Sequence, residues 1–181
     1  MIVFRHADPR FPFLWEAAAQ PPGRWHGPGE GPAHYLAETP DGAWAEFLRQ
    51  EEITAPDDVE TIARSLWAIE LRRPPVASPA LPSETLTGGR DSYDACQAEA
   101  RRLRAAGEPG LRAPSAALLP ATPSGFLTVG PLRPGPPRAE RVFVLFGPRP
   151  DLVGWAACAS GRPRPDLVAR VRQFDPNPGA G

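Results

Sequence analysis

The chain has 181 residues, of which 41% are hydrophobic and 23% are charged, so it is long enough for one domain with a buried core. Its formal net charge is −1 and all its cationic side chains are arginines, which excludes a basic nucleic-acid footprint and lysine-based Schiff-base chemistry. Two cysteines predict no disulfide framework, the first residues lack the apolar h-region expected of a signal peptide, and no apolar run reaches about 20 residues. These features predict a cytoplasmic protein that does not contact a membrane.

The first part of the chain predicts two short strands with an irregular segment between them. Residues 2–5 and 33–37 are short and apolar, as strands are. Residues 11–19 are apolar with an alanine tail, which indicates a helical turn that the following prolines end. Residues 21–32 are rich in glycine and proline and predict a structured loop around Arg24.

A helix is predicted from Pro40 to about residue 51. Thr39 offers a side-chain oxygen as N-cap, and Pro40 occupies the first helical position, where a missing N–H costs nothing. An apolar stripe that begins at Trp44 follows the helical spacing along one side. Glu46 points away from this stripe, so we expect it to face solvent or a separate cavity.

The remaining elements follow in order after this helix. Asp57 and Glu60 form a potential capping box for a second short helix, and a third helix begins after Asp91 or Ser92 and ends at Gly107. Apolar runs and alternation predict extended segments at residues 66–71, 110–113, 126–129, 142–146 and 152–159, with a loop at 131–137 and a terminal helix or strand at 166–174.

Strands and helices alternate irregularly in this pattern, and the strands are short. The fold class that fits is α+β, with mixed short-stranded sheets and flanking helices, because a doubly wound sheet needs regular alternation of strand and helix. We expect a single domain over residues 1–175 and a disordered tail over residues 176–181.

Two blocks of the sequence resemble the RES domain, a family named for an arginine, a glutamate and a serine. The first block runs from Gly23-Arg24-Trp25 through Tyr35 in a short strand to Glu46 in the following helix. The second runs from Tyr93 through a helix and a glycine turn to Ser115. The resemblance extends over about residues 4–129, and the order and spacing of the motifs carry it more than any one of them does.

The resemblance implies an ADP-ribosyltransferase-like fold and a toxin that degrades NAD+ by cleaving the nicotinamide–ribose bond, by hydrolysis or by phosphorolysis. It implies NAD+ as the substrate, phosphate as an optional co-substrate, no bound cofactor, and an Xre-type helix-turn-helix antitoxin as partner. By position, the arginine, the strand tyrosine, the glutamate and the serine of the family fall on Arg24, Tyr35, Glu46 and Ser115.

The chemistry of NAD+ cleavage asks for the same residue types. Loss of nicotinamide passes through an oxocarbenium-like transition state, which the carboxylate of Glu46 can stabilise. Arg24, with Arg5 as a second candidate, can bind the pyrophosphate, and Tyr35 can stack on nicotinamide. Ser115 can hydrogen-bond the nicotinamide ribose or the carboxamide. We expect Arg24→Ala to weaken substrate use more than folding.

Other interpretations stay open from the sequence. Each of the four family positions also has a structural explanation as a solvated helix, loop, packing or turn residue. The same fold could transfer ADP-ribose to a macromolecule, or bind NAD+ as an interaction module without turnover. His26 and His34 have no third ligand nearby, so no metal site is predicted.

Overall fold

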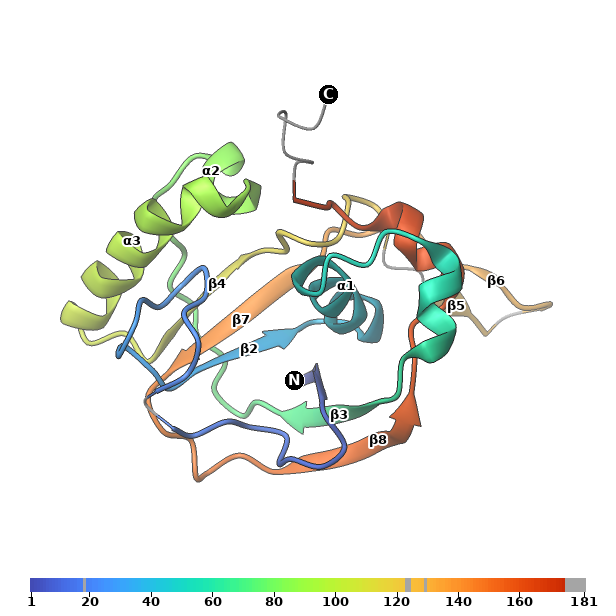
Figure 1. The fold of residues 1–181 in the computed structure, drawn as a ribbon, viewed down its shortest axis with the longest axis horizontal. Coiled ribbons are helices and arrows are strands. Elements are labelled where there is room, and N and C mark those ends of the chain that lie inside the picture. The colour runs from blue at the N-terminus through green and yellow to red at the C-terminus, as the bar shows by residue number, and fades with distance from the viewer. Residues whose placement is uncertain (18, 123–124, 129, 175–181) are drawn as a thin grey trace.

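The computed structural model describes residues 1–17, 19–122, 125–128 and 130–174 of the chain (Figure 1). Its strands are β1 (Ile2–Ala7), β2 (Ala33–Ala37), β3 (Arg64–Glu70), β4 (Gly110–Pro114), β5 (Phe126–Leu127), β6 (Arg133–Pro134), β7 (Arg141–Phe146) and β8 (Gly154–Gly161). Its helices are α1 (Pro40–Gln50), α2 (Ser83–Thr87) and α3 (Tyr93–Ala105), with 3-10 helices η1 (Pro56–Thr61), η2 (Arg90–Ser92) and η3 (Pro165–Arg170). The mixture confirms the α+β class.

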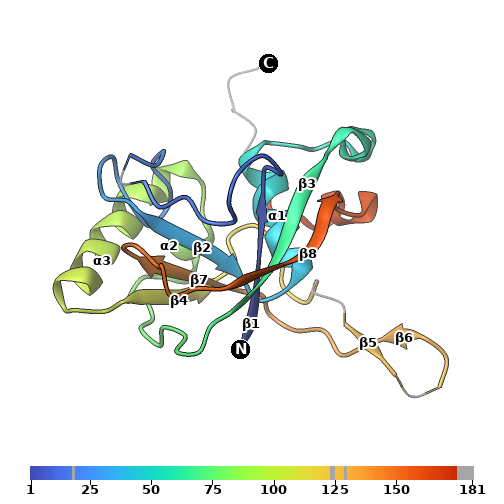
Figure 2. The same cartoon turned by 90° about the horizontal axis from the view of Figure 1, so that it is seen from below.

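The main sheet is antiparallel and has the order β4-β7-β2-β1-β3-β8. β1 pairs with β3 along its length, from Ile2↔Glu70 to Ala7↔Ser65, but it meets β2 only at Phe4↔Ala37. The sheet is therefore split into a β4-β7-β2 half and a β1-β3-β8 half. Figure 2 shows β1 and β3 crossing steeply past β2 and β7. We call the line between β1 and β2 the seam.

α1 forms as its sequence predicts and packs over the seam against β1 and β2. Thr39 is the N-cap, and its hydroxyl accepts a hydrogen bond of 3.0 Å from the Gly42 amide. The apolar stripe of the helix is buried at Trp44, Phe47 and Leu48 in one core cluster. This burial fixes the rotation of α1 about its axis, and thereby the direction of its other side chains.

α2 and α3 lie together beside β4 and cover the β4-β7-β2 half of the sheet (Figure 1). Cys96 and Leu103 of α3 are buried against Leu111 and Val144 of the sheet. Gly107 has a φ of 83°, which glycine adopts without strain, and it ends the helix where predicted. The Ser92 side chain precedes α3 but does not cap it, because its hydroxyl donates to the Gly89 carbonyl instead. The α2 helix was not predicted.

The helical turn predicted for residues 11–19 is wrong, since the described part of this segment contains bends, one turn residue and irregular chain but no helix. Side chains close together in this segment contact distant and separate parts of the protein, which a helix could not allow them to reach together. The Phe13 ring packs on Trp67 at 5.4 Å, whereas the Glu16 carboxylate binds the Arg149 amide. Tertiary contacts here override local propensity.

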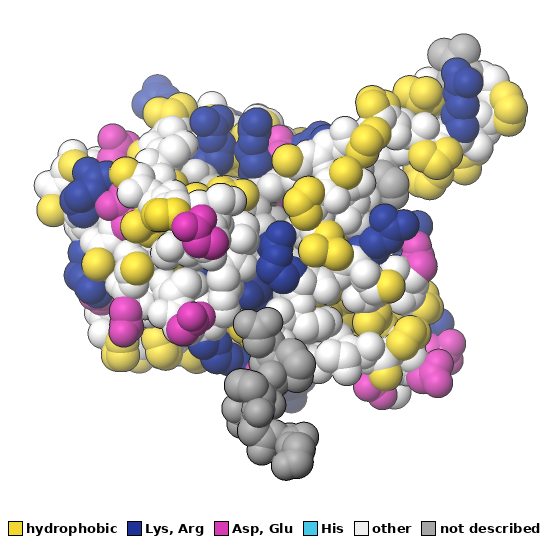
Figure 3. All heavy atoms as spheres, turned by 90° about the horizontal axis from the view of Figure 1, so that it is seen from above, with side chains coloured by type: hydrophobic (Ala, Val, Ile, Leu, Met, Phe, Trp, Pro, Cys, Tyr) yellow, Lys and Arg dark blue, Asp and Glu magenta, His cyan; other side chains and the backbone are white. Residues whose placement is uncertain are grey.

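The predicted short helix at Asp57 is a 3-10 helix without a side-chain cap, and Ala55 stands at its N-cap position. β5 covers only part of the predicted 126–129 strand, and residue 129 and the predicted tail lie outside the described residues. β6 forms inside the predicted 131–137 loop and pairs with β5. This hairpin projects from the body of the molecule (Figures 2 and 3).

The region after β7 completes the same core. β8 pairs with β3, and Leu167 and Val168 of η3 are buried in the cluster that holds α1. Acidic and basic side chains are interspersed over the face in Figure 3. Among the described helices, none has the length and apolar character that crossing a membrane requires.

Candidate functional site

A cavity of about 350 Å³ opens at the seam, between α1, the facing strands β1 and β2, and the loop around Arg24. Four of the five predicted site residues line it: Arg5, Arg24, Tyr35 and Glu46. Ser115 is buried directly behind Glu46 and reaches it with its hydroxyl. Residues from four separate parts of the chain therefore converge on one cavity.

Glu46 lies on the side of α1 opposite the buried stripe and faces this cavity. Its Oε1 accepts a hydrogen bond of 3.0 Å from the Ser115 hydroxyl. Burial raises the pKa of Glu46, and the Ser115 hydrogen bond and the positive charges of Arg49 and Arg24 oppose this rise. The result is a desolvated carboxyl whose charged form is supported by its neighbours.

Ser115 holds Glu46 in place. Its Oγ accepts from the amides of Ala117 at 3.2 Å and Leu118 at 3.0 Å, so the single hydroxyl proton is directed at Glu46. Because the oxygen already accepts two bonds, it is poorly placed to act as a nucleophile. The expected contact of Ser115 with the nicotinamide ribose stays a prediction.

Arg24 joins its loop to the α2–α3 region. Its guanidinium donates to Ser92 Oγ at 2.7 Å and to the Gly88 carbonyl at 2.6 Å, and it stacks on the Tyr93 ring at 4.8 Å. The side chain is only 7% exposed, and its charge is one of those that lower the pKa of Glu46. Arg24 thus has a structural task in addition to the binding role predicted for it.

The Tyr35 hydroxyl holds the loop that bears Arg24 through hydrogen bonds with Trp25 and His26. His26 Nε2 lies 3.0 Å from the Pro21 carbonyl, which can only accept, so Nε2 carries the proton. Burial lowers the pKa of His26, and in the neutral ring Nδ1 then accepts from the Tyr35 hydroxyl at 2.9 Å. The hydroxyl also accepts from the Trp25 amide at 2.9 Å. The phenol group is saturated by these bonds, while the ring lines the cavity.

Arg5 bridges the seam. Its Nη1 donates 3.1 Å to the Tyr35 carbonyl, where β1 and β2 no longer pair through their backbones. Burial lowers the pKa of Arg5 to about 10. Arg5, which lines the cavity, therefore links the two strands where the ladder between them ends.

Sequence reasoning missed Arg49, which lines the cavity one helical turn after Glu46. It is 3% exposed, donates to the Gly88 carbonyl at 2.6 Å and to the Ala116 carbonyl, and stacks on Phe174 at 4.5 Å. Burial and the charge of Arg24 lower the pKa of Arg49 to about 10. The i, i+3 spacing from Glu46 was the available signal for this residue.

The site contains cations, aromatic rings and one carboxyl. Among the described residues, no three His, Cys, Asp or Glu side chains lie close enough to hold an ion. A cavity of this composition suits an anionic molecule with a flat ring and a centre that becomes positive during reaction.

Comparisons with known proteins identify a similar fold and a family. The toxin–antitoxin complex MbcT–MbcA of M. tuberculosis contains a chain of similar fold, with a TM-score of 0.60, 19% sequence identity, and coverage of 93% of this chain and 86% of that one. No curated protein matches the sequence. The sequence pattern of the RES domain matches residues 2–148. The chain belongs to the RES domain family.

Proposed function

We propose that this protein is a RES-type toxin that degrades NAD+ by cleaving the bond between nicotinamide and ribose. The observation that carries the proposal is the half-buried Glu46 side chain, whose carboxyl faces the cavity, is oriented by Ser115 and lies near the guanidinium charges of Arg24 and Arg49. Perturbed titratable groups that converge on a cavity are typical of catalytic sites.

In the proposed reaction, the bond from the ribose C1′ to the nicotinamide nitrogen breaks and its electron pair leaves with neutral nicotinamide. Positive charge develops on the ribose, and the Glu46 carboxylate stabilises it. Phosphate or water then forms the new C1′–O bond, and with water a proton is released to solvent. With either acceptor, phosphate or water, no atom changes its oxidation state overall, so the reaction needs no redox cofactor.

The cationic neighbours serve this step in two ways. Arg24 and Arg49 place positive charge beside the cavity, where it attracts the pyrophosphate of NAD+ and a free phosphate acceptor. The same charges favour the ionised form of Glu46 against desolvation. The rings of Tyr35 and Tyr93 supply flat apolar surface for the nicotinamide.

Nicotinamide release tests the proposal. Purified protein is incubated with NAD+ in phosphate buffer and in a phosphate-free buffer, and Glu46→Gln is the inactive control. Faster release in phosphate selects phosphorolysis, and equal rates select hydrolysis. No release above the Glu46→Gln level in either buffer contradicts the proposed activity. Label from NAD+ on a macromolecule selects ADP-ribosyl transfer, and calorimetric binding without product selects a binding module.

We further propose that an antitoxin neutralises this protein in the cytoplasm, where NAD+ is available. The similar chain MbcT was solved together with its antitoxin MbcA, which supports a partner of this kind. The family resemblance points to an Xre-type helix-turn-helix protein. Expression of the chain alone should arrest growth, and co-expression of a neighbouring helix-turn-helix gene should restore it. Growth unaffected by the chain alone contradicts the toxin role.

A further inference from the structure

We infer that Trp15 forms a stacking platform for the adenine ring of the substrate, an inference that rests on the proposed function. Trp15 lines the cavity and is nevertheless 54% exposed, so its indole lies at the mouth. By contrast, Trp25 and Trp44 are 2% and 7% exposed. An exposed indole at the edge of a cavity offers a flat apolar face on which a base can stack.

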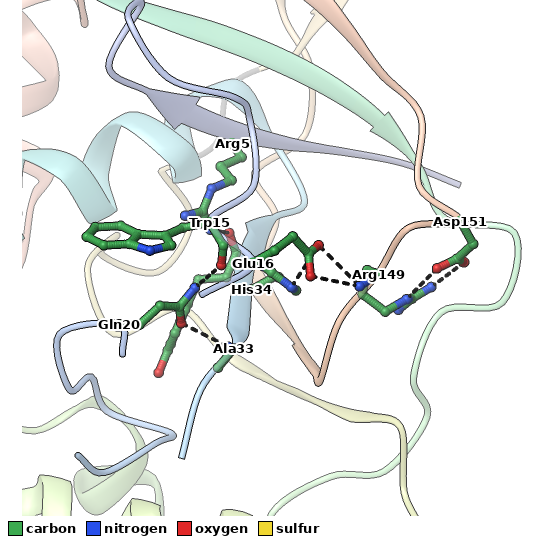
Figure 4. Close-up of polar contacts among 9 residues, drawn as sticks. Arg5, Trp15, Glu16, Gln20, Ala33, His34, Arg149 and Asp151 are labelled. Carbon is green, nitrogen blue, oxygen red and sulfur yellow. Dashed lines mark hydrogen bonds and ion pairs between the residues drawn. The ribbon is translucent and has the colours of Figure 1, made fainter. Parts of the chain in front are cut away.

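The backbone around this indole is fixed from one side by Gln20. The Gln20 side chain, 8% exposed, donates to the Trp15 carbonyl and accepts from the Ala33 amide at 2.9 Å (Figure 4). These bonds tie the segment to the start of β2, which itself lines the cavity. The position of Trp15 is therefore set relative to the strand that bears Tyr35.

The next residue is fixed from the other side. Both oxygens of Glu16 accept from the Arg149 amide at 3.1 Å, and Oε1 lies 3.5 Å from Nε2 of His34, a residue of β2 that is 0% exposed. Arg149 is in turn paired with Asp151 at 2.8 Å. Figure 4 shows the indole pointing away from this polar cluster. Glu16 thus orients the backbone while the indole stays open to a ligand.

The two residues before Trp15 are a half-buried phenylalanine and a buried leucine. Leu14 is 8% exposed, and the Phe13 ring packs on Trp67 at 5.4 Å. The exposed ring therefore sits in a segment that is anchored before it and after it, which is the arrangement of a preorganised platform. A ligand that stacks there does not have to order the segment first.

The adenine end of NAD+ fits this platform better than the nicotinamide end. In the proposed reaction the nicotinamide ribose must touch Glu46, whose carboxyl is desolvated inside the cavity. A cavity of about 350 Å³ is near the lower limit of the roughly 300–1,000 Å³ of small-molecule pockets, so it holds only part of a dinucleotide. The other half extends to the mouth, where the half-exposed indole lies.

Binding to a non-cleaving background separates the two halves of the substrate. The parent is the full chain carrying Glu46→Gln, and Trp15→Ala, Trp15→Leu and Trp15→Phe are each added to it. Calorimetry measures the Kd of NAD+, AMP and nicotinamide mononucleotide for the parent and for each variant. Trp15→Leu keeps apolar bulk without a π-face and serves if Trp15→Ala unfolds. The matched control is Trp155→Ala, because Trp155 is 53% exposed on β8 and does not line the cavity.

We expect the Kd of AMP and of NAD+ to rise about 5- to 150-fold in Trp15→Ala and Trp15→Leu, as loss of a base stack predicts. Trp15→Phe and Trp155→Ala should bind AMP as the parent does within error, and nicotinamide mononucleotide should bind all variants equally. The assignment is overturned if AMP binding ignores Trp15, if nicotinamide mononucleotide is weakened as much as AMP, or if the parent binds neither AMP nor NAD+.

The outcome is distinct from that of the cleavage assay. If the wild-type protein releases no nicotinamide but binds AMP through Trp15, the proposed reaction is wrong and the stacking role of Trp15 still holds. If the wild-type protein cleaves NAD+ and Trp15→Leu does so with the same KM, the stacking role of Trp15 is wrong and the proposed reaction still holds.

Discussion

Two carboxyl groups, Glu46 in α1 and Glu140 beside its N-terminus, differ in what surrounds them. Glu46 faces the cavity from the middle of the helix and accepts one side-chain hydrogen bond, from Ser115. Glu140, 4% exposed, lies at the N-terminus of the helix, where its two oxygens accept from the Thr39 amide at 2.9 Å and the Thr39 hydroxyl at 2.8 Å. Burial raises the pKa of both residues, that of Glu140 to about 7.

The raised pKa alone therefore does not identify the functional carboxyl. Glu140 is packed so closely that Gly42 has no room for a Cβ, and both its oxygens serve the capping residue of α1. Glu46 keeps bonding capacity free toward a cavity lined by cations and rings. Open bonding capacity toward a cavity distinguishes a candidate catalytic carboxyl from a structural one.

The largest expected effect separates the two carboxyls directly. Glu46→Gln should lower kcat for nicotinamide release by about 10²- to 10³-fold, which is typical when a transition-state charge loses its partner. Its thermal stability should not fall, because the amide still fits the cavity and accepts from Ser115. Glu140→Gln, the same chemical change outside the cavity, should leave kcat unchanged. Equal kcat losses in both variants would break the comparison.

The next effect is a pH-dependent stability that belongs to Glu140. Because its folded pKa of about 7 lies above the ordinary 4.5, the stability that it contributes is fully present below pH 4.5 and is lost as the pH rises through 7. The loss is at most about 3.4 kcal/mol, at about 1.36 kcal/mol per pKa unit. Glu140→Gln should flatten this part of the stability profile.

Chemical denaturation between pH 4.5 and 8 measures this loss, and Glu51→Gln, an exposed position at the other end of α1, is the control. A flat wild-type profile would mean that the positive end of the helix and the two bonds from Thr39 keep Glu140 ionised.

A third, smaller effect concerns Arg24, whose charge lowers the pKa of Glu46. Arg24→Ala should lower the free energy of unfolding by about 2–3 kcal/mol, because the Gly88 carbonyl and the Ser92 hydroxyl each lose a charged donor. This adds a folding cost to the loss of substrate use expected from the sequence. Urea denaturation alongside kinetics separates the two. Unchanged stability would show that Arg24 has no structural task.

The smallest effect is a shift of the acid limb of the pH–rate profile in Ser115→Ala. The Ser115 hydrogen bond lowers the pKa of Glu46, so its removal should raise that pKa and move the acid limb to higher pH. The variant should also lose about 1–2 kcal/mol of stability, because the Ala117 and Leu118 amides lose their acceptor. An unmoved acid limb would mean that Glu46 does not set it.

The sequence predicted best what short-range rules decide. The Thr39 cap, the strand that bears Tyr35, the end of α3 at Gly107 and the turning of Glu46 away from the core all follow from local spacing, and each is found in the structure. The convergence of the site residues came from the family resemblance, because no local rule places Ser115 against Glu46 across 69 positions.

What could not be predicted depends on distant partners. Arg49 is buried because the carbonyls of Gly88 and Ala116 meet it, and neither lies nearby in sequence. The apolar segment around Trp15 looked helical because its propensity does not reveal that Glu16 is anchored on Arg149. Propensity describes the isolated segment, whereas tertiary contacts decide its conformation.

Hydrogen exchange at the seam should report whether a ligand occupies the cavity. Across the seam, β1 and β2 are joined by one residue pair and by the bond from Arg5 to the Tyr35 carbonyl, so amides along these facing edges have few covering partners. A molecule lodged in the cavity rests on both sheet halves and holds them together. Deuterium uptake along β1 and β2 should therefore slow on binding, and it would register a ligand even in a variant that cannot turn it over.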